Sequence, residues 1–143
     1  MDSRINSTYW TLRIAFGLTA FLAGLDKFSN LLTNWEQYLS PLVTQLLPVT
    51  ASTFMHVVGV IEIAAGVLVL SKLTRLGAYV VAAWLVAIAL NLLFTGRYFD
   101  VAVRDVVMAV GAFTLAKLTE VRETSTAREP TTSAGMTPAR AGA

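Results

Sequence analysis

Long apolar runs alternate with short polar stretches along most of the chain. Four runs fall within the roughly 17 to 25 helical residues that cross a bilayer. They cover residues 9–28, 54–70, 76–95 and 101–118. The fourth qualifies when Arg104 and Asp105 lie at its outer end. The pattern predicts an all-α fold, a bundle of four transmembrane helices within a membrane domain of residues 1–123. The short link "SKLTR" makes the second and third runs antiparallel neighbours.

The segment after the first run has its own periodicity. In "NLLTNWEQYLSPLVTQLLP", leucines and Trp35 recur every three to four residues, which predicts an amphipathic helix on the outer face, broken near Pro41. Trp35 and Tyr38 suit the level of the lipid headgroups. Two interpretations stay open: a helix that lies in the interface, or a lid in which Trp35 and Tyr38 line the entrance to a site.

The distribution of basic residues predicts the orientation. Lysine and arginine are more frequent at the ends and in the loop that would face the cytoplasm, namely Arg4, Lys72, Arg75, Lys117 and Arg122. By the positive-inside rule, both termini are expected in the cytoplasm of a multi-pass protein. The stretch 124–143 is rich in Thr, Ala, Ser and Pro and is predicted to be a disordered cytoplasmic tail.

Composition narrows the class of protein. Apolar residues make up 55% of the 143 residues and charged residues 14%, against about 25% charged in soluble domains. The chain is therefore expected in a lipid bilayer. A net charge of +2 without a basic stripe gives no indication of nucleic-acid binding. The absence of cysteine excludes disulfides and thiol redox chemistry, and a single histidine excludes bis-histidine haem ligation. No haem or metal is expected.

Small residues are the expected contacts between helices, because they allow close approach in lipid. Each run holds a pair on one face: Ala20 with Gly24, Gly59 with Gly66, Ala83 with Ala87, and Ala112 with Ala116.

A carboxylate interrupts the second run. Glu62 stands near the middle of "HVVGVIEIAAGVLVL", where a charge costs about 2.5–3.5 kcal/mol on insertion scales. Intramembrane ionisable residues are functional candidates by default. Six further polar residues are expected near the same outer layer, forming one candidate site with Glu62: Asp26, Lys27, His56, Asn91, Arg104 and Asp105. Arg104 or Lys27 is the expected partner of Glu62, whereas Arg13 is expected to snorkel toward the cytoplasm. A purely structural ion pair is the alternative.

These motifs resemble those of the DoxX-like family of small four-helix membrane proteins. The resemblance rests on "LRIAFGLTAFLAGLDKF", "VGVIEIAAGVLVL" and "FDVAVRDVVMAVGAFTLAKL". It implies a role in membrane redox chemistry, in which family members include a subunit of thiosulfate:quinone oxidoreductase and partners in thiol-stress complexes. A quinone is then the candidate ligand, and the bacterial inner membrane the expected location. Related thiol-redox proteins carry paired cysteines, and this chain has none.

Three functions follow as hypotheses. The first is an accessory subunit of a quinone-linked redox system, with another membrane protein as partner and electron source. The second is a non-enzymatic scaffold or assembly factor, and the third a small-solute transporter. Whether the chain is itself catalytic stays open at this stage.

Overall fold

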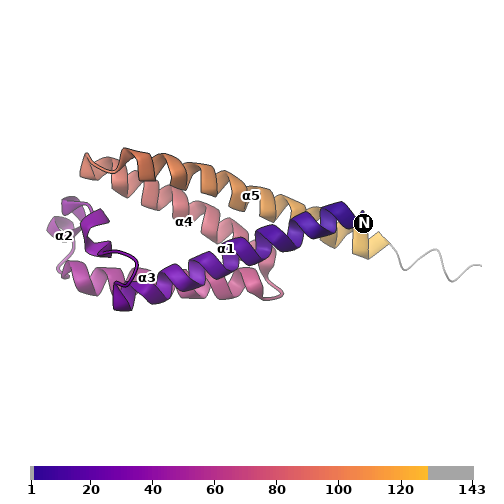
Figure 1. The fold of residues 1–143 in the computed structure, drawn as a ribbon, viewed down its shortest axis with the longest axis horizontal. Coiled ribbons are helices and arrows are strands. Elements are labelled where there is room, and N and C mark those ends of the chain that lie inside the picture. The colour runs from indigo at the N-terminus through magenta and orange to yellow at the C-terminus, as the bar shows by residue number, and fades with distance from the viewer. Residues whose placement is uncertain (1, 129–143) are drawn as a thin grey trace, which may run out of the picture.

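The computed structural model describes residues 2–128, and every element in that range is helical (Figure 1). The elements are α1 (Ser3–Ser29), the 3-10 helix η1 (Trp35–Tyr38), α2 (Pro41–Leu46), α3 (Ala51–Leu70), α4 (Thr74–Thr95) and α5 (Phe99–Arg128). The predicted all-α class is confirmed. By length and composition, α3 and α4 are apolar enough to cross a membrane.

The long helices associate as two pairs. Helix α1 packs along α3, and α4 packs along α5, while the tight turn between α3 and α4 joins the pairs (Figure 1). The η1–α2 segment lies at one end of the bundle, and the N-terminus and the last turns of α5 lie at the other.

Glycines bring the backbones of α1 and α3 into contact. A methyl group added to Gly24 would lie 2.6 Å from the carbonyl oxygen of Gly59, and one added to Gly59 would lie 2.8 Å from that of Gly24. Farther along the same contact, a methyl group on Gly66 would lie 2.7 Å from the carbonyl oxygen of Gly17. The two helices therefore meet at two places where a side chain has no room, as small-residue packing in membranes requires.

The expected small-residue contact of the third run is wrong. Ala83 and Ala87 are exposed, because α4 turns a different face toward its neighbours. That face presents Gly77, Ala78, Val81, Ala89 and Leu92. In α5 the expected pair, Ala112 and Ala116, is fully buried.

Two apolar clusters fill the bundle, one toward each end. The larger consists of Tyr9, Ala65, Val69, Ala78, Val81, Ala112, Leu115 and Ala116. The smaller consists of Ala89, Leu92 and Ala102, with Tyr38 and Tyr98 packed against it. Outward faces are apolar as well: Leu18, Val67, Val86 and Phe113, one from each long helix, are about half exposed. Such continuous exposed apolar surface is uncommon on soluble monomers.

The segment between α1 and α3 does not form one amphipathic helix. Residues 31–34 are non-helical, and η1 and α2 are separated by Leu39 and Ser40. Pro41 starts α2 instead of kinking a longer helix, since its missing amide costs nothing at the first helical position. The hydroxyl of Ser40 caps that start by accepting from the amide of Leu42.

Helix α5 continues past the expected domain boundary at residue 123. Residues 124–128, assigned from sequence to a disordered tail, are helical to Arg128. The hydroxyl groups of Thr124, Ser125 and Thr126 find partners within the helix, since each donates to a carbonyl four residues earlier. Residues 129–143 of the expected tail lie outside the described residues.

Candidate functional site

A buried ion pair joins the end of α1 to the middle of α3. The Lys27 ammonium lies 2.6 Å from a carboxylate oxygen of Glu62, and the two side chains are only 5% and 8% exposed. The indole N–H of Trp84, on α4, donates to the other oxygen of Glu62 over 3.3 Å. Glu62 therefore has a donor at each oxygen, as a buried carboxylate requires.

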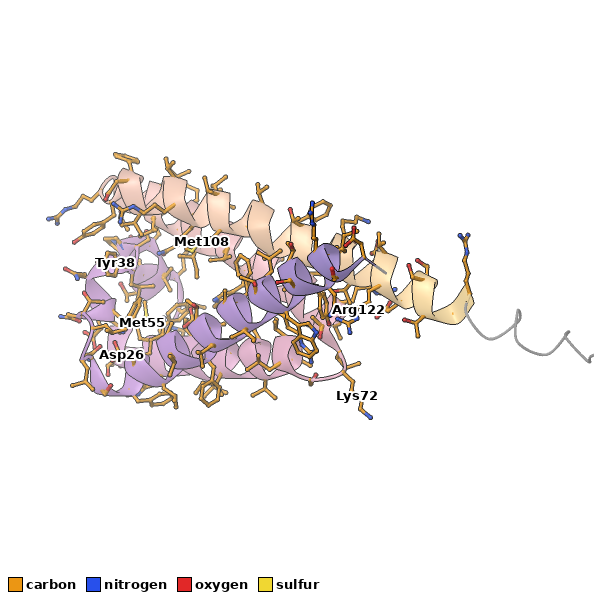
Figure 2. The ribbon with its side chains drawn as sticks, turned by 45° about the vertical axis from the view of Figure 1, so that its right-hand side comes forward. Asp26, Tyr38, Met55, Lys72, Met108 and Arg122 are labelled. Atoms are coloured by element: carbon orange, nitrogen blue, oxygen red, sulfur yellow. The ribbon has the colours of Figure 1, made fainter. Side chains whose placement is uncertain are left out.

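Asp26 organises the turn that follows α1. Its carboxylate accepts from the amides of Leu31 and Leu32 and, over 2.8 Å, from the indole N–H of Trp35. This places the Trp35 ring over Lys27, with the ammonium 3.7 Å from the ring centroid, an attractive cation–π geometry. Asp26 thus acts on Lys27 through Trp35. Figure 2 shows Asp26 and Tyr38 at the same end of the bundle.

Asp105 brings a second buried carboxylate to this ion pair. It is 6% exposed on α5, within range of the charges of Glu62 and Lys27. Among residues 2–128, no side chain forms an ion pair with it, and no group donates a hydrogen bond to it. The cluster Lys27–Glu62–Asp105 therefore contains one cationic and two acidic side chains from three helices.

Arg104 is not the partner of Glu62. Its side chain is 73% exposed and lies 3.6 Å from Asp100 on the preceding turn. The reason is helix geometry: adjacent residues point about 100° apart, so a helix that turns Asp105 inward turns Arg104 outward.

His56 also stands apart from the ion pair. Six residues separate it from Glu62, or about 240° around the helix. His56 is exposed and stacks on the Phe28 ring, with centroids 4.9 Å apart and planes at 6°.

Asn91 holds the outer segment in place. Its side-chain oxygen accepts from the amide of Ser40 over 3.0 Å, and its side-chain nitrogen donates to the carbonyl of Tyr38 over 2.7 Å. These backbone groups, left without helical partners between η1 and α2, are satisfied by one amide side chain. Tyr38 and Trp35 lie near each other, with ring centroids 6.3 Å apart.

A comparison with models of protein families identifies the family of the chain. A family model described as DoxX matches residues 9–95. The chain belongs to the DoxX family. The matched range contains Lys27, Glu62 and Trp84 and ends before Asp105. Among curated proteins and solved structures, none matches the chain. The family and the two apolar helices together identify a membrane protein.

Two important residues of this DoxX protein escaped prediction from its sequence. Trp84 donates the second hydrogen bond to Glu62. The sequence feature that could have indicated this role is an indole N–H within an apolar run, because a buried indole N–H needs an acceptor. Arg13 does not simply snorkel: it donates to the carbonyls of Val69, Leu70 and Ser71. It thereby satisfies the exposed carbonyls at the C-terminus of α3.

The chemistry available to the DoxX cluster is that of hydrogen bonds and protons. Lys27 supplies donors and Asp105 supplies an acceptor, while the single N–H of Trp84 is used by Glu62. Among the described residues, no group of three His, Asp or Glu side chains gathers as a metal site would need. A shallow apolar groove between α1 and α3 is lined by Leu18, Phe21, Val67, Leu70 and Ser71, and Glu62 is not among its lining residues.

Proposed function

We propose that this DoxX protein is an accessory subunit of a quinone-linked membrane redox system. In this proposal four helices cross the membrane, and the Lys27–Glu62–Asp105 cluster binds the polar head of a quinone that enters from the outer leaflet. Another membrane protein supplies the electrons, because the chain contributes no electron carrier of its own.

The packing supports four spans. Helix α1 follows α3 through the Gly24–Gly59 and Gly17–Gly66 contacts, so it crosses the same layer as α3. Helix α5 packs along α4. Both α1 and α5 carry exposed apolar side chains along their length, among them Ile14, Leu22, Val107 and Val110. Residues 14–25 of α1 and 106–116 of α5 carry no charged side chain, so the charges of these helices lie toward their ends, where spanning helices tolerate them.

The charge distribution supports an orientation with both termini in the cytoplasm. Lys72 and Arg122 lie at the end of the bundle opposite Asp26 and Tyr38 (Figure 2). That end also holds the N-terminus, and a basic end is expected inside. The cell membrane, specifically a bacterial inner membrane, is the proposed location.

The observation that carries the proposal is the second carboxylate. A structural ion pair needs one acid for Lys27, and Glu62 already fills that role at 2.6 Å. Asp105 is buried beside this pair without an ion-pair partner among the described residues, an arrangement that is costly unless it serves a purpose. Quinone carbonyl oxygens need donors, and the Lys27 ammonium has further N–H groups besides the one that it gives to Glu62, whereas the single N–H of Trp84 is already used by Glu62. A quinol hydroxyl needs an acceptor, which Asp105 provides.

A scaffold or assembly factor is the second candidate, and the closed ion pair favours it. Both oxygens of Glu62 have donors, and Lys27 is enclosed by Glu62 and the Trp35 ring. A network this complete can hold three helices together without any ligand. A transporter role finds no specific support in the geometry.

Native mass spectrometry from a gentle detergent, with a short-chain benzoquinone added, distinguishes these functions. We expect one quinone per chain. Asp105→Asn should weaken its binding about tenfold to a hundredfold, because a charge-assisted hydrogen bond contributes about 1.5–3 kcal/mol. Asp100→Asn removes the same charge from an exposed position on the same helix and should leave binding unchanged. Absence of quinone binding, with another membrane protein co-purifying, would instead establish the scaffold.

A further inference from the structure

Two arginines and two aromatic rings gather at the end of the bundle opposite the Glu62 site. The guanidinium carbon of Arg122, on α5, lies 4.4 Å from the ring centroid of Tyr9 and 5.5 Å from that of Trp10. The guanidinium carbon of Arg13 lies 4.7 Å from the Trp10 centroid. We call these four residues the arginine–aromatic cluster. Figure 2 places Arg122 at the same end as Lys72.

The two arginines differ in how their N–H groups are used. Arg13 donates to three carbonyls at the end of α3 and to the Tyr9 hydroxyl. Nη1 of Arg122 is buried and has no hydrogen-bond partner in the part of the chain that the structure describes. A buried unsatisfied donor of a charged group is costly. Because Nη1 itself is covered by the protein, an acceptor from outside can meet only the rest of the guanidinium group, which the partly exposed side chain leaves accessible.

The nearby acidic side chains do not fill this role. Glu120 accepts from the Tyr79 hydroxyl over 2.6 Å and from Lys117 over 3.0 Å, and these hydrogen bonds, that from Tyr79 foremost, lower the pKa of Glu120. Glu123 pairs with Arg75 over 3.1 Å. Among residues 2–128, neither Arg13 nor Arg122 forms an ion pair with a carboxylate.

We propose that the arginine–aromatic cluster binds the phosphate group of an anionic phospholipid in the cytoplasmic leaflet. The planar guanidinium fork matches phosphate oxygens in a bidentate fashion. Trp10 is of the residue type that settles at the headgroup level, and a cytoplasmic membrane surface with anionic lipids attracts basic side chains. The assignment to that leaflet rests on the orientation in the proposed function.

The apolar groove described above supports a lipid as the source of the phosphate. Its lining includes Leu70 and Ser71, the residues whose carbonyls bind Arg13. From there the groove extends to Leu18, Phe21 and Val67, deeper in the bundle by one to two turns. A phospholipid with its phosphate at the cluster has an acyl chain in reach of this groove, whereas a free phosphate ion would leave it uncovered.

The test compares binding of phosphatidylglycerol, phosphatidylcholine and inorganic phosphate to the delipidated full chain by native mass spectrometry. We expect one tightly retained phosphatidylglycerol per chain and weak retention of phosphatidylcholine. Arg122→Gln should reduce phosphatidylglycerol affinity about tenfold, because it removes a charge-assisted bidentate contact. Arg122→Lys keeps the charge but not the planar guanidinium fork, so its phosphatidylglycerol affinity should lie between those of the wild type and Arg122→Gln. It replaces Arg122→Gln in the test if that variant does not fold. Lys72→Gln removes an exposed charge at the same end and should change affinity little.

Equal losses in Arg122→Gln and Lys72→Gln would overturn the proposal, since they would indicate only a diffuse attraction to negative lipid. Displacement of phosphatidylglycerol by inorganic phosphate at equal concentration would overturn the lipid assignment in favour of a free anion. The same samples separate this site from the quinone site: Arg122→Gln should keep the quinone adduct, and Asp105→Asn should keep the lipid adduct. Either site can therefore fail without the other.

Discussion

At the scale of single residues, the environment of Lys27 sets the character of the bundle. Its ammonium has the Glu62 carboxylate on one side and the Trp35 ring on the other. Glu62 also accepts a hydrogen bond from Trp84, and Trp35 donates one to Asp26. Removing one member of such a buried pair strands the other charge, whereas replacing both with uncharged groups is often tolerated.

This arrangement predicts the outcome of a double-mutant experiment. Glu62→Gln should destabilise the protein in detergent by about 3–5 kcal/mol, because Lys27 loses the carboxylate 2.6 Å away, and Asp105, which forms no ion pair with it among the described residues, does not take its place. Glu62→Gln combined with Lys27→Met should recover most of that loss. Thermal and denaturant melts measure both variants, with exposed Arg104→Gln as the control that should change little. A single mutant as stable as the wild type would show that the pair does not hold the helices together.

Sequence reasoning could identify Glu62 but not its full surroundings. A carboxylate in an apolar run stands out by cost alone, and depth along the helices named Lys27 and Arg104 as its possible partners. The choice between them depends on the rotation of α5 about its axis, which turns Asp105 inward and Arg104 outward. Depth is readable from residue spacing, whereas rotation follows from packing with the other helices.

At the scale of elements, the contact between α1 and α3 depends on backbone approach. Gly24 and Gly59 face each other's carbonyl oxygens, and those oxygens belong to helices that cannot shift locally. Adding bulk at such a position forces the two helices apart along their length, and overpacking of this kind costs about 1–3 kcal/mol.

A glycine comparison tests this contact. Gly59→Ala should lower stability by about 1–3 kcal/mol and weaken the Lys27–Glu62 pair, which bridges the same two helices. Gly111→Ala adds the same methyl group to α5, where it would meet the far end of the Phe16 ring at 2.9 Å. That ring can rotate away, so the control should be nearly neutral in the same melts. Equal effects at both positions would contradict a specific role for the α1–α3 contact.

Element types were more predictable than their ends and faces. Apolar periodicity was sufficient for the four long helices, and Pro41 correctly marked a discontinuity. The apolar periodicity could not reveal that the Asn91 side chain would hydrogen-bond the carbonyl of Tyr38 and the amide of Ser40. These hydrogen bonds stabilise the break between η1 and α2. The periodicity also failed for Ala83 and Ala87, because a small-residue pair has the same spacing whether it faces a neighbouring helix or lipid.

At the scale of the whole molecule, the two ends of the bundle differ in chemistry. One end carries Asp26, Trp35 and Tyr38 with the η1–α2 segment, and the other carries Lys72 and Arg122 (Figure 2). This asymmetry was readable from the sequence as a bias of basic residues. The sequence did not predict which helices pair, α1 with α3 and α4 with α5, because all four runs are similarly apolar.

The proposed orientation can be tested by labelling with an impermeant maleimide in intact cells. The chain has no cysteine, so single substitutions need no altered background. Gln45→Cys, exposed in α2, should react, whereas Lys72→Cys, exposed between α3 and α4, should react only after the cells are permeabilised. The reverse pattern would place both termini outside and move the arginine–aromatic cluster to the other leaflet.

The separation of Lys27 from Glu62 along the chain also has a consequence in time. Glu62 follows Lys27 by 35 positions, so during synthesis α1 leaves the ribosome well before its counter-charge does. A lone ammonium is poorly tolerated in hydrocarbon, and a long lysine side chain near a helix end can reach the interface instead. The newly made α1 is therefore expected to hold Lys27 at the membrane surface and to bury it only when α3 arrives, so that burial of this charge marks the pairing of α1 with α3, before α4 and α5 are added.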